Sequence, residues 1–183
     1  LCDLSVFLSL NLGGLLFNIR QLKLLLSSDF LLDSRSRFMV NWDIRKVYSV
    51  NNDAIQATWE YLYKVVVLSN KSLERIDLYA ETHTDKELAA YRAEVRALRA
   101  LYYYLIDLFG NVPLVLSSST SMKEVTQKSR REVYDFVVQE LQESAPELST
   151  AHSNLPGTYY GRITRPVVYF LLAKLALNAE VYA

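Results

Sequence analysis

The stretch of sequence that decides the fold is KELAAYRAEVRALRALYYYLIDLFGNVP, residues 86–113. Large apolar side chains recur here in steps of three and four over three heptads, which is the pattern of one helix face. Gly110 stands where a left-handed residue ends a helix, and Pro113 prevents continuation. The sequence therefore predicts a helix over residues 86–109. Four further apolar side chains widen the stripe, so we expect packing on more than one side: Leu101, Tyr103, Tyr104 and Leu108.

Four other stretches also predict helices. One is an apolar run over residues 4–26, and a second covers residues 53–78, with Asp53 as its N-cap. Ser129 and Glu132 form the S-x-x-E capping box of a helix that Pro146 closes. Thr164 can cap the last helix, with Pro166 in the first turn. The last helix also has alanines three residues apart that would let a neighbouring backbone come close: Ala173, Ala176 and Ala179.

The spacing of these helices predicts their arrangement. Their starts near residues 53, 86, 129 and 164 are separated by intervals that approach the tetratricopeptide period, but each interval holds one long helix. Residues 27–52 read as a long loop, and residues 112–116 as a short extended piece. We therefore predict an all-α fold of antiparallel helical hairpins stacked as tetratricopeptide-like repeats, in one domain over residues 1–183.

Composition excludes several classes of protein. The chain of 183 residues is 51% hydrophobic and 22% charged, a balance typical of folded globular proteins. Its formal net charge is zero, so it lacks the electrostatic footprint of a nucleic-acid binder. One cysteine and two histidines exclude a disulfide framework and a His/Cys-rich metal site, and we expect no cofactor. Polar residues interrupt the run over residues 4–26 before it reaches the length of a membrane span.

No catalytic motif is present, so we expect no enzymatic activity. His83 and His152 fall in predicted loops, and Glu140 and Glu143 are most simply a solvated face. The arginines of the helix over residues 86–109 allow two interpretations. Arg92, Arg96 and Arg99 could form intrahelical surface pairs. Alternatively, Arg99 turns inward to hold the backbone or a carboxylate of a packed neighbour.

The loop over residues 27–52 is the candidate ligand site. Its aromatic side chains Trp42 and Tyr48 lie among planar polar groups such as Arg45. A sugar ring needs this combination, because its C–H faces stack on aromatic rings while its hydroxyls bind planar polar groups. The alternative is that the loop folds back and Trp42 fills a hole in the core. If a ligand binds here, Trp42 is the stacking residue, assisted by Arg45 and Tyr48.

Several blocks of the sequence, taken together, resemble the signature of the SusD/RagB family. EVRALRA at residues 94–100 is followed by three tyrosines and by DLFGNVPL at residues 107–114. GRIT at residues 161–164 and LLAKL at residues 171–175 are similar to later family blocks. Residues 59–76 resemble an earlier family helix. Ala93 and Val95 depart mildly from the usual glycine and alanine.

The resemblance implies a nutrient-binding lipoprotein on the outside of the outer membrane. Such proteins are non-catalytic, bind glycans or, in some members, peptides, and deliver them to a TonB-dependent SusC-like transporter. The chain resembles the amino-terminal portion of longer family members. Membrane attachment is expected only through a lipid anchor, which is absent from this chain. The motif residues Glu94, Arg99, Gly110 and Pro113 then read as structural. A helical protein-interaction module without a small ligand remains the alternative.

Overall fold

The structure is a computed structural model that describes residues 53–121 and 123–182. Contacts divide the chain after Ala54. Apart from residues 53 and 54, which begin the first described helix, the described residues all belong to the unit Ile55–Ala183. The predicted helix over residues 4–26 and the predicted loop over residues 27–52 lie outside the described residues. The single domain over residues 1–183 therefore stays a prediction.

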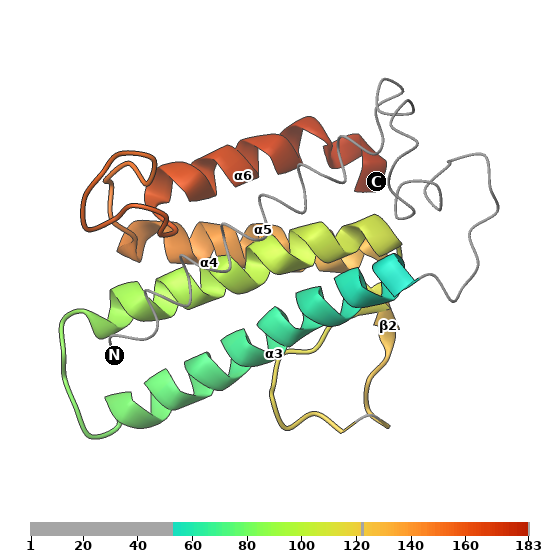
Figure 1. The fold of residues 1–183 in the computed structure, drawn as a ribbon, viewed down its shortest axis with the longest axis horizontal. Helices are drawn as coiled ribbons and strands as arrows, with labels where there is room; N and C mark the ends of the chain where they lie inside the picture. Colours follow the sequence, from blue (N-terminus) through green and yellow to red (C-terminus); the bar gives the residue numbers. More distant parts are fainter. Residues whose placement is uncertain (1–52, 122, 183) are drawn as a thin grey trace, which may run out of the picture. The chain divides into compact units, whose positions relative to one another are not determined.

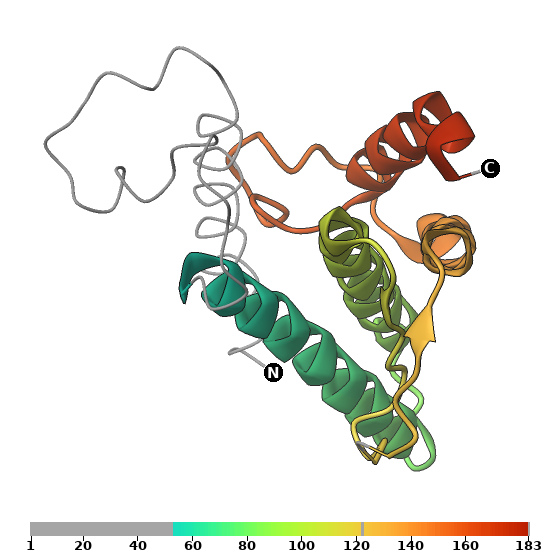
Figure 2. The ribbon, with the colours of Figure 1, turned by 90° about the vertical axis from the view of Figure 1, so that its right-hand side faces the viewer.

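Four helices make up most of the described unit (Figure 1). They are α3 (Asp53–Ala80), α4 (Leu88–Ile106), α5 (Arg130–Ser144) and α6 (Arg165–Leu177). Successive helices run antiparallel, and α5 packs against both α4 and α6. The view from the side places α3 and α5 on opposite sides of α4 (Figure 2). The predicted all-α, tetratricopeptide-like hairpin stack is confirmed.

Short turns and strands connect the helices. Among the described residues, three 3₁₀ turns extend helix ends: η2 (Asp107–Phe109), η3 (Ala145–Glu147) and η4 (Ala179–Tyr182). The predicted extended piece after Gly110 contains β1 (Val112–Pro113), which pairs antiparallel with β2 (Gln127–Lys128). Between these strands lies the loop over residues 114–126, whose described residues, 114–121 and 123–126, form turns but no helix or strand of their own.

Helix α4 is the centre of the core, as its stripe predicts. Tyr102, Tyr103 and Ile106 are fully buried, so the helix packs on more than one side. Leu108 departs from the prediction, because it is 64% exposed on the 3₁₀ turn η2, where the helical period no longer holds. The neighbouring helices contribute these buried apolar side chains: Leu62, Val65, Val66, Leu73, Val133, Val137, Leu141, Val168, Leu171 and Leu175.

Helix ends mostly follow the predicted signals. Gly110 adopts a positive φ of 85°, which an L side chain rarely adopts, and directly follows η2. Ser129 and Glu132 form the predicted capping box: Glu132 N donates to Ser129 Oγ, and Ser129 N donates to Glu132 Oε2 at 2.9 Å. Thr164 is the N-cap of α6, but its buried hydroxyl makes no capping bond. Helix α5 ends at Ser144, two residues before Pro146 as predicted, and Pro146 lies in the 3₁₀ turn η3.

The alanines of α6 do not have the predicted role in the described part of the chain. Ala173 and Ala176 are exposed, on a helix whose Tyr169, Phe170 and Leu177 are exposed as well. The buried side of α6 carries larger side chains instead.

The capping box of α5 should make the free energy of unfolding depend on pH. Hydrogen bonds from the Ser129 backbone, then from Lys128 and the Ser129 hydroxyl, lower the pKa of Glu132 from 4.5 to about 2. A depressed folded-state pKa stabilises the fold above the unfolded pKa, and this contribution is lost as pH falls to about 2. We expect the stability difference between the unaltered chain and Glu132→Gln, measured by urea denaturation, to shrink over that range. A pH-independent difference would contradict the assignment.

Candidate functional site

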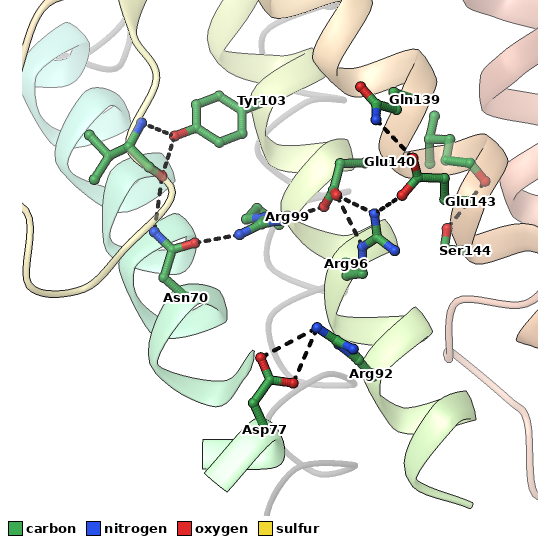
Figure 3. A network of polar contacts seen from close by, with 12 residues as sticks. Asn70, Asp77, Arg92, Arg96, Arg99, Tyr103, Gln139, Glu140, Glu143 and Ser144 are labelled. Atoms are coloured by element: carbon green, nitrogen blue, oxygen red, sulfur yellow. Dashed lines mark hydrogen bonds and ion pairs between the residues drawn. The ribbon is translucent and has the colours of Figure 1, made fainter. Parts of the chain in front are cut away.

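A buried network of charges joins three helices (Figure 3). Arg99 of α4 donates from Nη2 to Glu140 Oε2 of α5 at 2.6 Å, and from Nη1 to Asn70 Oδ1 of α3 at 2.9 Å. Arg96, one turn earlier on α4, donates to Glu140 Oε1 at 2.6 Å and to Glu143. Arg99 is only 8% exposed and Glu140 6%. The carboxylate of Glu140 is thus neutralised from both sides inside the helical stack.

The same network fixes the start of the loop over residues 114–126. Asn70 Nδ2 donates to the carbonyl of Val115 at 2.9 Å (Figure 3). The hydroxyl of Tyr103 donates to that carbonyl at 2.8 Å and accepts from the amide of Val115 at 2.7 Å. Both polar backbone groups of Val115 are therefore satisfied by side chains of α3 and α4. The position of the loop follows from the packing of the helices.

A second buried ion pair attaches the segment before α6 to α4. Arg162 Nη2 lies 2.7 Å from Glu94 Oε1, and the side chain of Glu94 is 5% exposed. The guanidinium of Arg162 lies 5.1 Å from the ring centroid of Tyr159 and 5.9 Å from that of Tyr91, so two aromatic faces hold it. Burial raises the pKa of Glu94, and the bond and charge of Arg162 oppose this.

A third cluster fixes the end of the described chain. Arg130 of α5 donates two hydrogen bonds to Asp107, at 3.0 and 2.8 Å. The hydroxyl of Tyr182 in η4 donates to the same carboxylate at 2.8 Å, and its ring stacks on Tyr134 at 4.5 Å between centroids. Burial, then the bond to Asp107, raises the pKa of Tyr182 to about 12. These contacts hold η4 against η2 and α5.

The clusters decide between the interpretations of the charged residues. Arg99 does turn inward to a carboxylate of a packed neighbour. The intrahelical pairing of Arg92 and Arg96 is wrong: Arg92 pairs with Asp77 of α3, and Arg96 with α5. The expectation that Glu140 is solvated is also wrong. Glu140 lies seven residues after the buried Val133, on the buried face of α5, and this spacing is the sequence signal that could have located it.

A groove lies within the described unit, between the end of α3, the start of α4 and the end of α5. It has a volume of about 310 Å³ and is lined by apolar residues such as Ile76 and Leu88 and by charged residues. Its two arginines, Arg92 and Arg96, already form ion pairs with lining carboxylates. The groove therefore presents no unpaired arginine to an anionic ligand.

The predicted ligand residues Trp42, Arg45 and Tyr48 lie outside the described residues, so they stay predictions. Between Ile55 and Tyr182, no three His, Cys, Asp or Glu side chains are grouped as a metal site would require. His83 and His152 lie in loops as predicted. Among the described helices, none has the length and apolar character needed to cross a membrane.

Comparisons with known proteins identify the family. The family model SusD-like_3, described as "Starch-binding associating with outer membrane", matches residues 26–177. The chain is 35% identical over 103 residues to the starch-binding protein SusD of Bacteroides thetaiotaomicron, covering 56% of this chain and 18% of that protein. It is 24% identical over 116 residues to SusD-like protein P2 of Formosa agariphila, covering 61% and 21%.

Solved structures agree with this result. A SusD-like carbohydrate-binding protein from Bacteroides fragilis is similar at a TM-score of 0.62 and 26% identity, covering 72% of this chain and 25% of that one. A laminarin-binding SusD-like protein has a TM-score of 0.59 and 26% identity, covering 67% and 26%. The chain belongs to the SusD-like family. It spans about a fifth of the length of the curated relatives that it matches.

The family motifs coincide with the buried charges. Glu94 and Arg99 belong to the first motif block, and Arg162 belongs to a later block, 68 residues away from its partner Glu94. Gly110 and Pro113 form the turn and the strand that follow α4. These residues hold the helices and connecting segments together, so the motif is a signature of the scaffold.

The ion pair between Glu94 and Arg162 should determine how the stability of the fold changes as pH falls. Replacing Arg162 by Met leaves a buried carboxylate without its partner, and we expect a loss of about 3 kcal/mol at pH 7. The pKa of Glu94, already raised, should rise further. Because the folded state then binds the proton more tightly, stability should recover as pH falls through that raised value. Urea denaturation of Arg162→Met between pH 7 and pH 5 measures this recovery.

The double variant Glu94→Gln/Arg162→Met is the matched control. Like the single variant, it lacks the guanidinium, but it also has no buried carboxylate to protonate. Its stability relative to the unaltered chain should therefore not recover on acidification. Equal pH responses of the single and double variants would contradict the assignment to Glu94.

Proposed function

We propose that this chain is the scaffold-bearing portion of a protein that binds glycans at the outer-membrane surface. The observation that carries the proposal is the match over residues 26–177 to a family described as starch-binding. Relatives described as starch-binding and laminarin-binding support a carbohydrate as the ligand class. The proposed role is binding without catalysis, since these descriptions name binding and no reaction.

The proposed binding residues belong to the predicted loop over residues 27–52, which lies entirely within the family match. Trp42 would stack on the apolar face of a sugar ring, with Tyr48 beside it. Arg45 would donate hydrogen bonds to ring hydroxyls from its planar guanidinium. Binding from a few stacking contacts and hydrogen bonds is modest in affinity, which suits a protein that must release its ligand.

The proposed destination of the ligand is a TonB-dependent transporter of the SusC type, which the protein would cover at the cell surface. The family description of association with the outer membrane supports this location. The helical stack would provide the rigid body for that contact, because its helices are tied to one another by buried ion pairs. Attachment to the membrane would come from a lipid anchor.

Affinity electrophoresis tests the proposal. The intact protein and the 183-residue chain are run through gels cast with starch, laminarin and other polysaccharides. Retardation of the intact protein by one polysaccharide is the expected result, and retardation of the chain would locate binding within these residues. No retardation in any gel would contradict glycan binding and favour a peptide ligand or a protein-interaction module.

The variant Trp42→Ala tests the stacking residue. Loss of one aromatic face should weaken binding about tenfold, since a tenfold change corresponds to 1.4 kcal/mol. Trp42→Phe is the matched control and should retain most of the affinity, because it keeps an aromatic face. Unchanged affinity in Trp42→Ala, with an unchanged unfolding midpoint, would remove Trp42 from the site.

A further inference from the structure

A cluster of hydroxyl groups lies on the loop over residues 114–126, next to α3. We call Ser117, Ser118, Ser119 and Thr120 the hydroxyl cluster. It is organised by Glu74 of α3, whose Oε1 accepts hydrogen bonds from Ser117 Oγ at 3.0 Å and from Ser118 N at 2.8 Å. Oε2 of the same carboxylate accepts from Ser118 Oγ at 2.5 Å. One carboxylate therefore holds two consecutive residues of the loop.

The direction of each hydrogen bond follows from the number of protons. A hydroxyl has one proton to donate and two lone pairs that accept. Ser117 gives its proton to Glu74, so in the bond of 2.9 Å between Ser117 Oγ and Ser119 Oγ the donor is Ser119. Thr120 Oγ1 donates to the carbonyl of Ser117 at 3.1 Å. All four hydroxyl protons are thus used in bonds to Glu74 or within the cluster.

The outer side of the cluster consequently offers hydrogen-bond acceptors. Ser118 Oγ, Ser119 Oγ and Thr120 Oγ1 each retain lone pairs but have no proton left to donate. Ser119 is exposed, and Ser118 and Thr120 are partly exposed. Leu116, 47% exposed, precedes the cluster and offers an apolar surface beside it.

The cluster is also held in place before any ligand arrives. Val115, two residues before Ser117, is bonded to Asn70 and Tyr103, and Asn70 belongs to the network of Arg99. Ser117 and Ser118 are bonded to Glu74 as described. Fixing polar groups in advance lowers the entropy that binding must overcome. Long loops that a rigid scaffold positions often have binding functions.

The ligand that fits this surface is an uncharged donor of hydrogen bonds. The carboxylate of Glu74 already accepts three hydrogen bonds, and these bonds, then the charge of Lys71, lower its pKa. Lys71 brings a compensating positive charge near Glu74, which disfavours selection of a cation. Sugar hydroxyls are uncharged donors, and the C–H groups of a sugar ring can contact Leu116.

We infer that the hydroxyl cluster is a second glycan-contacting surface, in which Ser118, Ser119 and Thr120 accept hydrogen bonds from sugar hydroxyls. This inference rests on the proposed function, because it assumes that the ligand is a glycan. It adds a contact surface within the described residues, on a different segment of the sequence from the predicted site residues Trp42, Arg45 and Tyr48. Glu74 is the positioning residue of this surface.

The test is the double variant Ser119→Ala/Thr120→Val in the intact protein. It removes two acceptors and leaves the bonds between Glu74 and Ser118 in place. Binding to the polysaccharide that retards the unaltered protein most strongly should weaken about tenfold, as expected for two hydrogen bonds of ordinary strength. Thr158→Val/Ser153→Ala, which removes two hydroxyls from the segment before α6, is the matched control and should bind as the unaltered protein does.

Each outcome is decisive. Equal affinity of the test variant and the unaltered protein would overturn the hydroxyl cluster as a glycan surface while leaving the proposed function standing. Equal weakening of the test and control variants would overturn it too, because the effect would not be specific. An unaltered protein that binds none of the polysaccharides would overturn the proposed function and this inference together.

Discussion

The charge of Glu140 is the constraint on which the helical stack depends. A carboxylate that is 6% exposed costs several kcal/mol to bury unless cations and hydrogen bonds compensate for the lost water. Arg96 and Arg99 supply that compensation from α4, and Arg99 reaches Asn70 of α3 at the same time. The three helices must therefore come together in one register, because any other register leaves a buried charge unpaired.

The network extends from the helices to the surface that we propose to bind glycans. Arg99 orients Asn70, and Asn70 with Tyr103 fixes Val115 at the beginning of the loop over residues 114–126. The family motif accordingly describes a scaffold that positions loops. Members of one family can then bind different glycans by changing loop residues while keeping the buried ion pairs.

The sequence predicts the regular parts of this fold because their signals are local. The stripe of α4, the glycine that follows η2 and the capping box of α5 each depend on neighbouring residues, and all three are confirmed. Glu140 was missed because its burial depends on arginines more than 40 residues away, although its spacing from Val133 placed it on the apolar face. The residues of the candidate site, Trp42, Arg45 and Tyr48, are predicted from residue type alone and lie outside the described residues.

The most direct test of this account is a double-mutant cycle between Arg99 and Glu140. Free energies of unfolding are measured by urea denaturation for the 183-residue chain, Arg99→Met, Glu140→Gln and the double variant. Each single variant should lose about 3 kcal/mol, because it leaves a buried partner uncompensated. The double variant should lose less than the sum by about 1–3 kcal/mol. Losses that add within about 0.5 kcal/mol would contradict the claim that this ion pair holds the helices together.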